Sequence, residues 1–233
     1  MSVTVTIERM DGGPHLVLEC ADDLAVAFFA HDASSVGTDP FDAHAGAGTP
    51  DLITDDDITV INQTMRARSP HDQWVTFTHN TEPLPWMAAL DPSWDLFGLS
   101  EPDWAHVRPV VEQALREVIG PYRNLAVATK VLHLKRPGIV PVLDSLVVDQ
   151  IGGAGKQPIE MVSHLRAQGI ANRAAIDAIR GRLATTIVDG TPIHRSPVRI
   201  LDGLLWTSHP RTSLGAEPLI GWERVMRRGG TSK

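Results

Sequence analysis

The chain has only one cysteine, Cys20, among 233 residues. A single thiol cannot form an intramolecular disulfide or a Cys-type zinc site, which favours a reducing, cytoplasmic location. Long apolar runs are also missing, because the longest covers only residues 24 to 30, and the amino terminus has no basic segment followed by an apolar one. We therefore expect neither a signal peptide nor a membrane partner.

Basic residues are scarce in the first quarter of the chain. The net charge is −7, and residues 1 to 60 hold twelve acids against Arg9 alone, a local charge of −11. Residues 61 to 233 hold sixteen acids and twenty bases, a local charge of +4. The overall charge argues against nucleic-acid binding, whereas the mildly basic remainder fits either a local cationic surface or a solvated mixture of charges. We divide the chain into an acidic segment, 1–50, and a helical domain, 51–233.

Strand-like patterns are confined to the amino terminus. Residues 3 to 8 alternate apolar and polar side chains, and residues 16 to 18 can pair with them across a Gly-Gly turn, which predicts a β-hairpin. A short helix over residues 22 to 30 and a loop over residues 34 to 50 follow. Thr54 and Asp57 have capping-box spacing, which predicts a helix from Thr54 to about Arg68.

The rest of the chain has helical periodicity. Residues 69 to 102 are rich in proline and tryptophan and predict short helices and turns. Longer helices are expected at residues 101–119, 125–134, 144–151, 158–168, 171–185 and 196–206. Strands and helices do not alternate as a parallel sheet requires. The predicted fold class is mainly α with a short N-terminal β-hairpin.

Residues 128 to 147 are the only segment that suggests a reaction. Pro137 ends one helix, and Pro141 forces the preceding residue to be extended. Asp144 then begins the next helix, where a cap aspartate needs no further explanation. Lys130 lies among apolar residues, and partial burial there would lower the pKa of its amine and make it a usable nucleophile.

This segment resembles the helix-hairpin-helix DNA glycosylase superfamily, whose signature places a lysine on the second hairpin helix and an aspartate after a Pro-Val step. Here these residues are Lys130 and Asp144, joined by Leu-Lys-Arg-Pro-Gly-Ile-Val-Pro-Val. The chain is more similar still to an uncharacterised actinobacterial family with a Lys-Arg-Pro-x-x-x-Pro-Val-x-Asp core. There the segments 41–42, 54–57 and 62–70 also match.

The resemblance implies a helical glycosylase-like architecture for residues 51–233, a DNA partner and base-excision chemistry. The amine of Lys130 would attack the sugar carbon, and Asp144 would support the developing positive charge. We assign nucleic-acid binding to four residues of the hairpin and of the end of the lysine helix, namely Tyr122, Arg123, Lys135 and Arg136. No cofactor or metal is implied.

Two departures from the glycosylase pattern leave the function open. Only Gly120 stands where the superfamily has two hairpin glycines, and the spacing from Lys130 to Asp144 is several residues shorter. Three classes therefore remain. They are an active glycosylase or lyase, a catalytically silent nucleic-acid-binding relative, and a small-molecule or protein-binding module on the same scaffold.

Other candidate sites have simpler explanations. The Gly-rich residues 152 to 156 lack the spacing of a phosphate loop and predict a helix end followed by a loop. The acids at residues 55 to 57 suit the first turn of a helix without a metal. His133 lies one turn from Lys130, within reach of the same site. Arg199 and Asp202 predict a pair on a helix surface.

Overall fold

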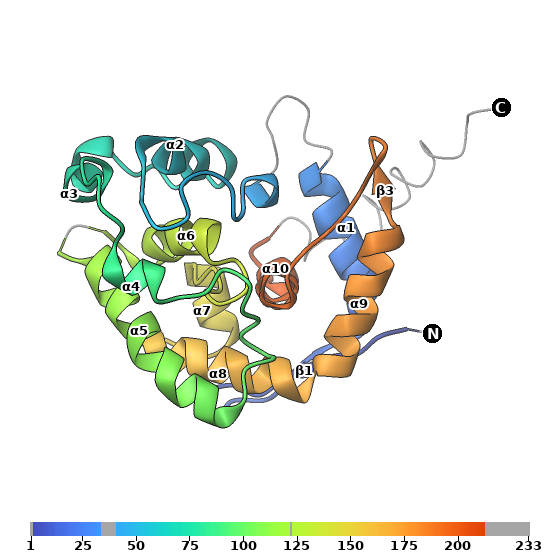
Figure 1. Ribbon diagram of the computed structural model, residues 1–233. Helices are drawn as coiled ribbons and strands as arrows, with labels where there is room; N and C mark the ends of the chain where they lie inside the picture. The colour runs from blue at the N-terminus through green and yellow to red at the C-terminus, as the bar shows by residue number, and fades with distance from the viewer. Residues whose placement is uncertain (1, 34–40, 122, 213–233) are drawn as a thin grey trace.

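The computed structural model describes residues 2–33, 41–121 and 123–212. It is mainly helical with a short antiparallel hairpin at the N-terminus, which confirms the predicted fold class (Figure 1). The elements up to the long central helices are β1 Val5–Ile7, β2 Leu16–Leu18, α1 Ala21–Ala33, η1 Phe41–Ala43, α2 Asp55–Thr64, η2 His71–Trp74, α3 Val75–Thr78 and α4 Pro85–Ala88. The remaining elements are α5 Glu101–Ile119, α6 Leu125–Lys135, α7 Ser145–Gln150, α8 Pro158–Ala171, α9 Arg173–Thr185, β3 Ile187–Val188, β4 Thr191–Pro192 and α10 Pro197–Ser208.

The N-terminal hairpin forms in the expected place. Val5 of β1 is opposite Leu18 of β2, and Ile7 is opposite Leu16. Val5 and Ile7 are fully buried while the residue between them is exposed, which is the alternation that a half-buried strand requires. The helix that follows, α1, packs against α9 and α10, so the acidic first segment contributes to the same core as the C-terminal helices.

The second helix begins as the sequence predicts and ends earlier. The Thr54 side chain accepts from the backbone N–H of Asp57, and Asp57 accepts from the backbone N–H of Thr54 at 2.7 Å, which completes the capping box. The helix stops at Thr64 and does not reach Arg68. Arg66 and Arg68 have φ values of +48° and +52°, a left-handed conformation that cannot continue a right-handed helix.

Helix α10 is the centre of the molecule. It is seen end-on in Figure 1, and it packs against α1, α7, α8 and α9. Most of its residues are buried, including Arg199, Asp202 and Thr207 on its polar face, because other elements cover it on every side. On the other side of the fold, α6 packs against α5 and α2. The connection from α6 to α7 runs between these two parts and carries the candidate site.

Two further findings limit the kinds of site that the described ranges hold. Within them, no helix combines the length and apolarity needed to cross a membrane. The same residues contain no group of three or more His, Cys, Asp or Glu side chains arranged to hold a metal ion. The Gly-rich residues 152 to 156 form a loop after the end of α7, as the sequence predicts.

Candidate functional site

The connection between α6 and α7 has the shape that its two prolines impose. Helix α6 ends at Lys135, before Pro137, and Val140 precedes Pro141. The side chain of His133 on α6 is bonded to the carbonyl oxygen of Val140 over 2.7 Å. Since a carbonyl only accepts, His133 Nδ1 carries the proton in this contact. The turn is therefore fastened to the helix that precedes it.

Lys130 lies on α6, and its side chain is half-buried. Its Nζ donates to the carbonyl oxygen of Met65 at 3.2 Å. Burial lowers the pKa of Lys130, the negative charge of Asp144 raises it in part, and the positive charge of Arg199 lowers it further. A lysine with a lowered pKa is a better nucleophile at neutral pH than an exposed lysine.

Asp144 caps α7 with one of its two carboxylate oxygens. Its Oδ1 accepts from the backbone N–H groups of Leu146 and Val147, each at 3.0 Å. Within the described ranges, Oδ2 receives no hydrogen bond, and Asp144 forms no direct ion pair with Lys130. The charge of Asp144 nevertheless influences Lys130 through space, although their side chains do not touch.

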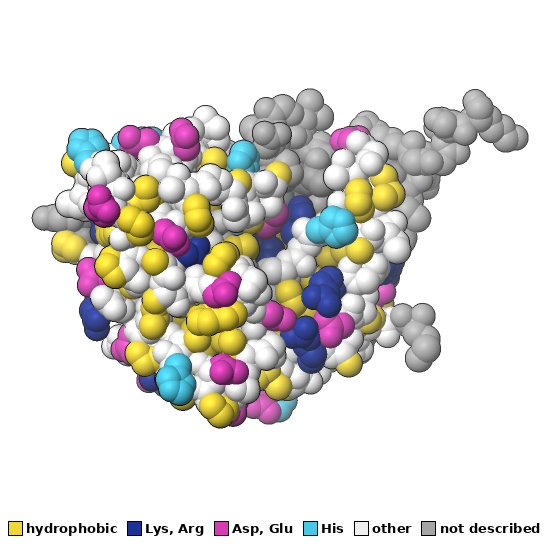
Figure 2. All heavy atoms as spheres, viewed as in Figure 1, with side chains coloured by type: hydrophobic (Ala, Val, Ile, Leu, Met, Phe, Trp, Pro, Cys, Tyr) yellow, Lys and Arg dark blue, Asp and Glu magenta, His cyan; other side chains and the backbone are white. Residues whose placement is uncertain are grey.

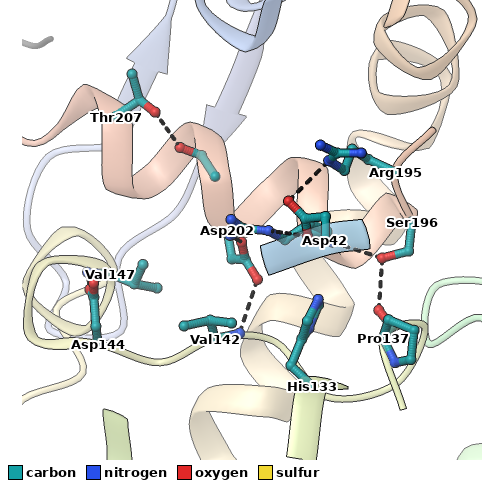
Figure 3. A network of polar contacts seen from close by, with 12 residues as sticks. Asp42, His133, Pro137, Val142, Asp144, Val147, Arg195, Ser196, Asp202 and Thr207 are labelled. Carbon is teal, nitrogen blue, oxygen red and sulfur yellow. Dashed lines mark hydrogen bonds and ion pairs between the residues drawn. The ribbon is translucent and has the colours of Figure 1, made fainter. Parts of the chain in front are cut away.

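A buried ion-pair network lies next to this pair and consists of Asp42, Arg195, Arg199 and Asp202 (Figure 3). Arg199 Nε is 2.8 Å from Asp42 Oδ1, and Arg199 Nη1 is 2.6 Å from Asp202 Oδ1. Arg195 Nε lies 3.0 Å from Asp42 Oδ2 without the alignment of a hydrogen bond. The network fastens η1, which carries Asp42, to α10.

The charged groups of the network and their burial shift one another's pKa values. Burial disfavours the charged form of Asp42, yet Arg199 and Arg195 hold its pKa below the ordinary value. Burial raises the pKa of Asp202 to about 7, against the opposing effects of Arg199 and of the backbone N–H of Val142. Although burial lowers it, the pKa of Arg199 is raised overall by Asp42 and Asp202.

The prediction that Arg199 and Asp202 form a pair on a helix surface was wrong. Their side chains are only 6% and 1% exposed. The i, i+3 spacing is the same in either case. The apolar residues of α10 gather on one face and the pair lies on the other, as in a surface helix, so only the packing of neighbouring elements shows that the pair is buried.

His133 joins the two parts of the site. It is fully buried, its ring stacks on Phe41 with centroids 5.7 Å apart, and Figure 3 shows it pointing toward Asp42. Burial, together with the charge of Arg199, lowers the pKa of His133 to about 4. The ring is therefore neutral at physiological pH, and its Nε2, which has no hydrogen-bond partner among the described residues, is an acceptor.

Residues that bind nucleic acid are expected at the surface, but those of the predicted set that the structure describes are buried. Tyr122 lies outside the described residues. Arg123 is buried between the rings of Trp74 and Phe77, 4.9 Å from each centroid, and donates to backbone carbonyl oxygens, including that of Val118. Burial lowers the pKa of Arg123.

Lys135 and Arg136 are each only 1% exposed. Lys135 Nζ is 2.7 Å from Asp57 Oδ1, and Arg136 forms an ion pair with Asp51 at 2.6 Å and donates to several carbonyl oxygens. Binding a phosphate through these two side chains would require removing groups that the fold uses internally. Their role in nucleic-acid binding stays a prediction.

The architecture defines a mainly helical protein with a buried charged network beside a half-buried lysine. The profile of a protein family described as "Family of unknown function (DUF6308)" matches residues 21–209, and the chain belongs to this family. The matched range contains every residue of the ion-pair network as well as Lys130 and Asp144. No curated protein and no solved structure matches the chain.

Proposed function

We propose that this chain is a DNA-glycosylase-like protein in which the amine of Lys130 forms a covalent intermediate with the sugar of a damaged nucleotide. The observation that carries the proposal is the environment of Lys130, which is half-buried, has a lowered pKa and lies in the field of Asp144. The amine would add to the aldehyde carbon of an abasic sugar and lose water to form an imine. The free oxygen of Asp144 would stabilise the positive charge of that imine.

Trapping with borohydride tests this chemistry, because the reagent reduces an imine to a stable amine. The chain has four lysines, of which Lys135 is buried and Lys233 lies outside the described residues. We expect an adduct between the protein and DNA with an abasic site, no adduct with Lys130→Ala, and an undiminished adduct with Lys156→Ala, whose side chain is exposed. The absence of any adduct with the unaltered protein would remove the proposal.

A second candidate is a module that binds a small molecule or a protein without chemistry. It is favoured by the internal use of Arg123, Lys135 and Arg136, and by the pairing of the basic residues on α9 with acids. Arg173 and Arg182, for example, each contact two aspartates. Figure 2 shows Lys and Arg side chains interleaved with Asp and Glu on this face and not gathered into one basic area.

Salt dependence separates the two candidates. A nucleic-acid-binding protein shifts DNA at low ionic strength and releases it as salt rises, because phosphate contacts displace counterions. The module predicts no shift of either intact or abasic DNA even at low salt. A salt-sensitive shift that persists in Lys130→Ala, without trapping in the unaltered protein, would instead indicate a catalytically silent DNA-binding relative.

A further inference from the structure

The segment just before Asp144 lies outside the helices and is held by hydrogen bonds to two helices. The backbone N–H of Val142 donates to Asp202 Oδ2 on α10 at 2.9 Å, and the backbone N–H of Leu143 donates to Thr129 Oγ1 on α6 at 3.0 Å. Two consecutive backbone amides thus each find a buried side-chain oxygen on a different helix, so neither is left without an acceptor.

The two acceptors are themselves held in fixed positions. The hydroxyl of Thr129 donates to the carbonyl oxygen of Leu125 at 2.9 Å, so its lone pairs remain for the Leu143 amide. Asp202 uses Oδ1 for Arg199 and Oδ2 for Val142. Both Thr129 and Asp202 are at most 1% exposed, so water cannot replace either contact without opening the core.

The hydrogen bond between Leu143 and Thr129 connects the backbones of the two predicted catalytic residues. Thr129 is the neighbour of Lys130 on α6, and Leu143 is the neighbour of Asp144, so a single hydrogen bond fixes the distance between the two backbones. The cap that Asp144 makes on α7 fixes its Oδ1, but it does not set where the start of α7 lies relative to α6. That relation depends on the Thr129 and Asp202 contacts, together with the His133–Val140 bond and the packing of α7 on α10.

We propose that Thr129 and Asp202 are positioning residues that hold the carboxylate of Asp144 within electrostatic reach of the Lys130 amine. The inference rests on the proposed function for its chemical meaning, but the coupling is a property of the free protein. Loss of the Thr129 acceptor lets the segment before Asp144 move away from α6, and Lys130 then loses the nearby negative charge.

The test measures the reactivity of Lys130 toward an acylating reagent as a function of pH, by mass spectrometry of the labelled peptides. Asp144→Asn removes the charge that raises the pKa of Lys130, so the labelling profile moves to lower pH and labelling at neutral pH becomes faster. We expect Thr129→Val, which keeps the shape and removes the hydroxyl, to move the profile in the same direction. Thr129→Ser, which keeps the hydroxyl, restores the original profile.

A double variant shows whether both changes act through the same interaction. If Thr129 acts by positioning Asp144, Thr129→Val adds little to the shift already caused by Asp144→Asn. An unchanged profile in Thr129→Val, or full additivity of the two shifts, overturns the proposal, as does an unchanged profile in Asp144→Asn. Labelling of Lys156, which is exposed, is the internal reference in every sample.

If Thr129→Val does not fold, hydrogen exchange in the unaltered protein tests the two backbone contacts instead. The amides of Val142 and Leu143 should exchange as slowly as those of the core of α6, and exchange at the rate of unbonded amides would overturn the proposal. Failure of borohydride trapping leaves these measurements unaffected. A coupled Lys130 and Asp144 without trapping would reject the proposed chemistry alone, whereas trapping together with uncoupled profiles would reject the positioning role alone.

Discussion

Asp202 accepts a hydrogen bond from the backbone N–H of Val142 at 2.9 Å, although the two residues are 60 positions apart in the chain. The other oxygen of the same carboxylate is paired with Arg199 at 2.6 Å. One buried side chain therefore links the charge balance inside α10 to the course of the segment that leads to Asp144. Asp202 thus connects the ion-pair network to the candidate catalytic pair.

Asp42→Asn should destabilise the protein strongly. It would leave Arg195 without its acidic partner and Arg199 with Asp202 alone, in the buried interior. Breaking a buried ion pair by removing one partner costs about 3 to 5 kcal/mol. Urea unfolding measures the change in free energy. Asp56→Asn, on an exposed residue of α2, is the control and should change the stability by about 0.5 kcal/mol or less.

The lowered pKa of His133 should make stability fall as the pH is lowered from about 6.5 toward 4, whereas the raised pKa of Asp202, about 7, acts in the opposite direction over this range. The pKa of His133 is lowered in the folded protein to about 4, so in this range the unfolded chain binds a proton that the folded protein does not. Its contribution is complete above pH 6.5 and is lost as the pH falls, with a total of roughly 3 kcal/mol. His133→Gln should remove this contribution, so the unfolding free energy of the variant relative to the unaltered protein should rise as the pH falls from 6.5 to 4.

The exposed His79 provides the matched control, because His79→Gln should leave the curve unchanged. The lowered pKa of Asp42 acts in the same direction at lower pH, since its contribution is present above the unfolded value near 4 and is lost below it. A curve for His133→Gln with the same slope between pH 6.5 and 4 as the unaltered protein would contradict the prediction.

Two helical glycines should respond in opposite ways to replacement by alanine. A Cβ on Gly169 of α8 would lie 2.3 Å from the ring of Phe97, whereas a Cβ on Gly181 of α9 would meet nothing within 4 Å. Gly181→Ala should therefore stabilise the protein by about 0.5 to 1 kcal/mol through helix propensity. Gly169→Ala should destabilise it by about 1 to 3 kcal/mol. Thermal unfolding compares the two, and equal effects would exclude close packing of α8 on Phe97.

Lys135→Met should affect stability and not nucleic-acid affinity. Lys135 pairs with Asp57 at 2.7 Å and joins α6 to α2, so its loss leaves a carboxylate without its partner at a cost of about 3 kcal/mol. Lys156→Met, on an exposed residue, is the control for the loss of one positive charge. A lower DNA affinity of Lys135→Met with an unchanged melting temperature would favour the surface role predicted from the sequence.

Local features of the fold could be predicted because their causes lie within a few residues. The Thr54 capping box, the proline-marked turn after α6 and the Asp144 cap each depend on neighbouring backbone groups and appear where the sequence places them. The sequence placed the end of α2 too late, because the apolar pattern does not predict the left-handed conformations of Arg66 and Arg68. The hydrogen bond from Leu143 to Thr129 was not foreseen because a threonine within a helix has no distinct signal.

The sequence alone determined the helices, the hairpin and the place of Lys130 in an apolar segment. Only the tertiary structure decided which charged residues are buried, because a charge leaves water only where an opposite charge or several hydrogen-bond acceptors meet it. Arg199 meets Asp42 from 157 positions away, and Lys135 meets Asp57 from another helix. No local sequence pattern reveals these contacts. They place residues that were expected at the surface in the interior, where they support the candidate site.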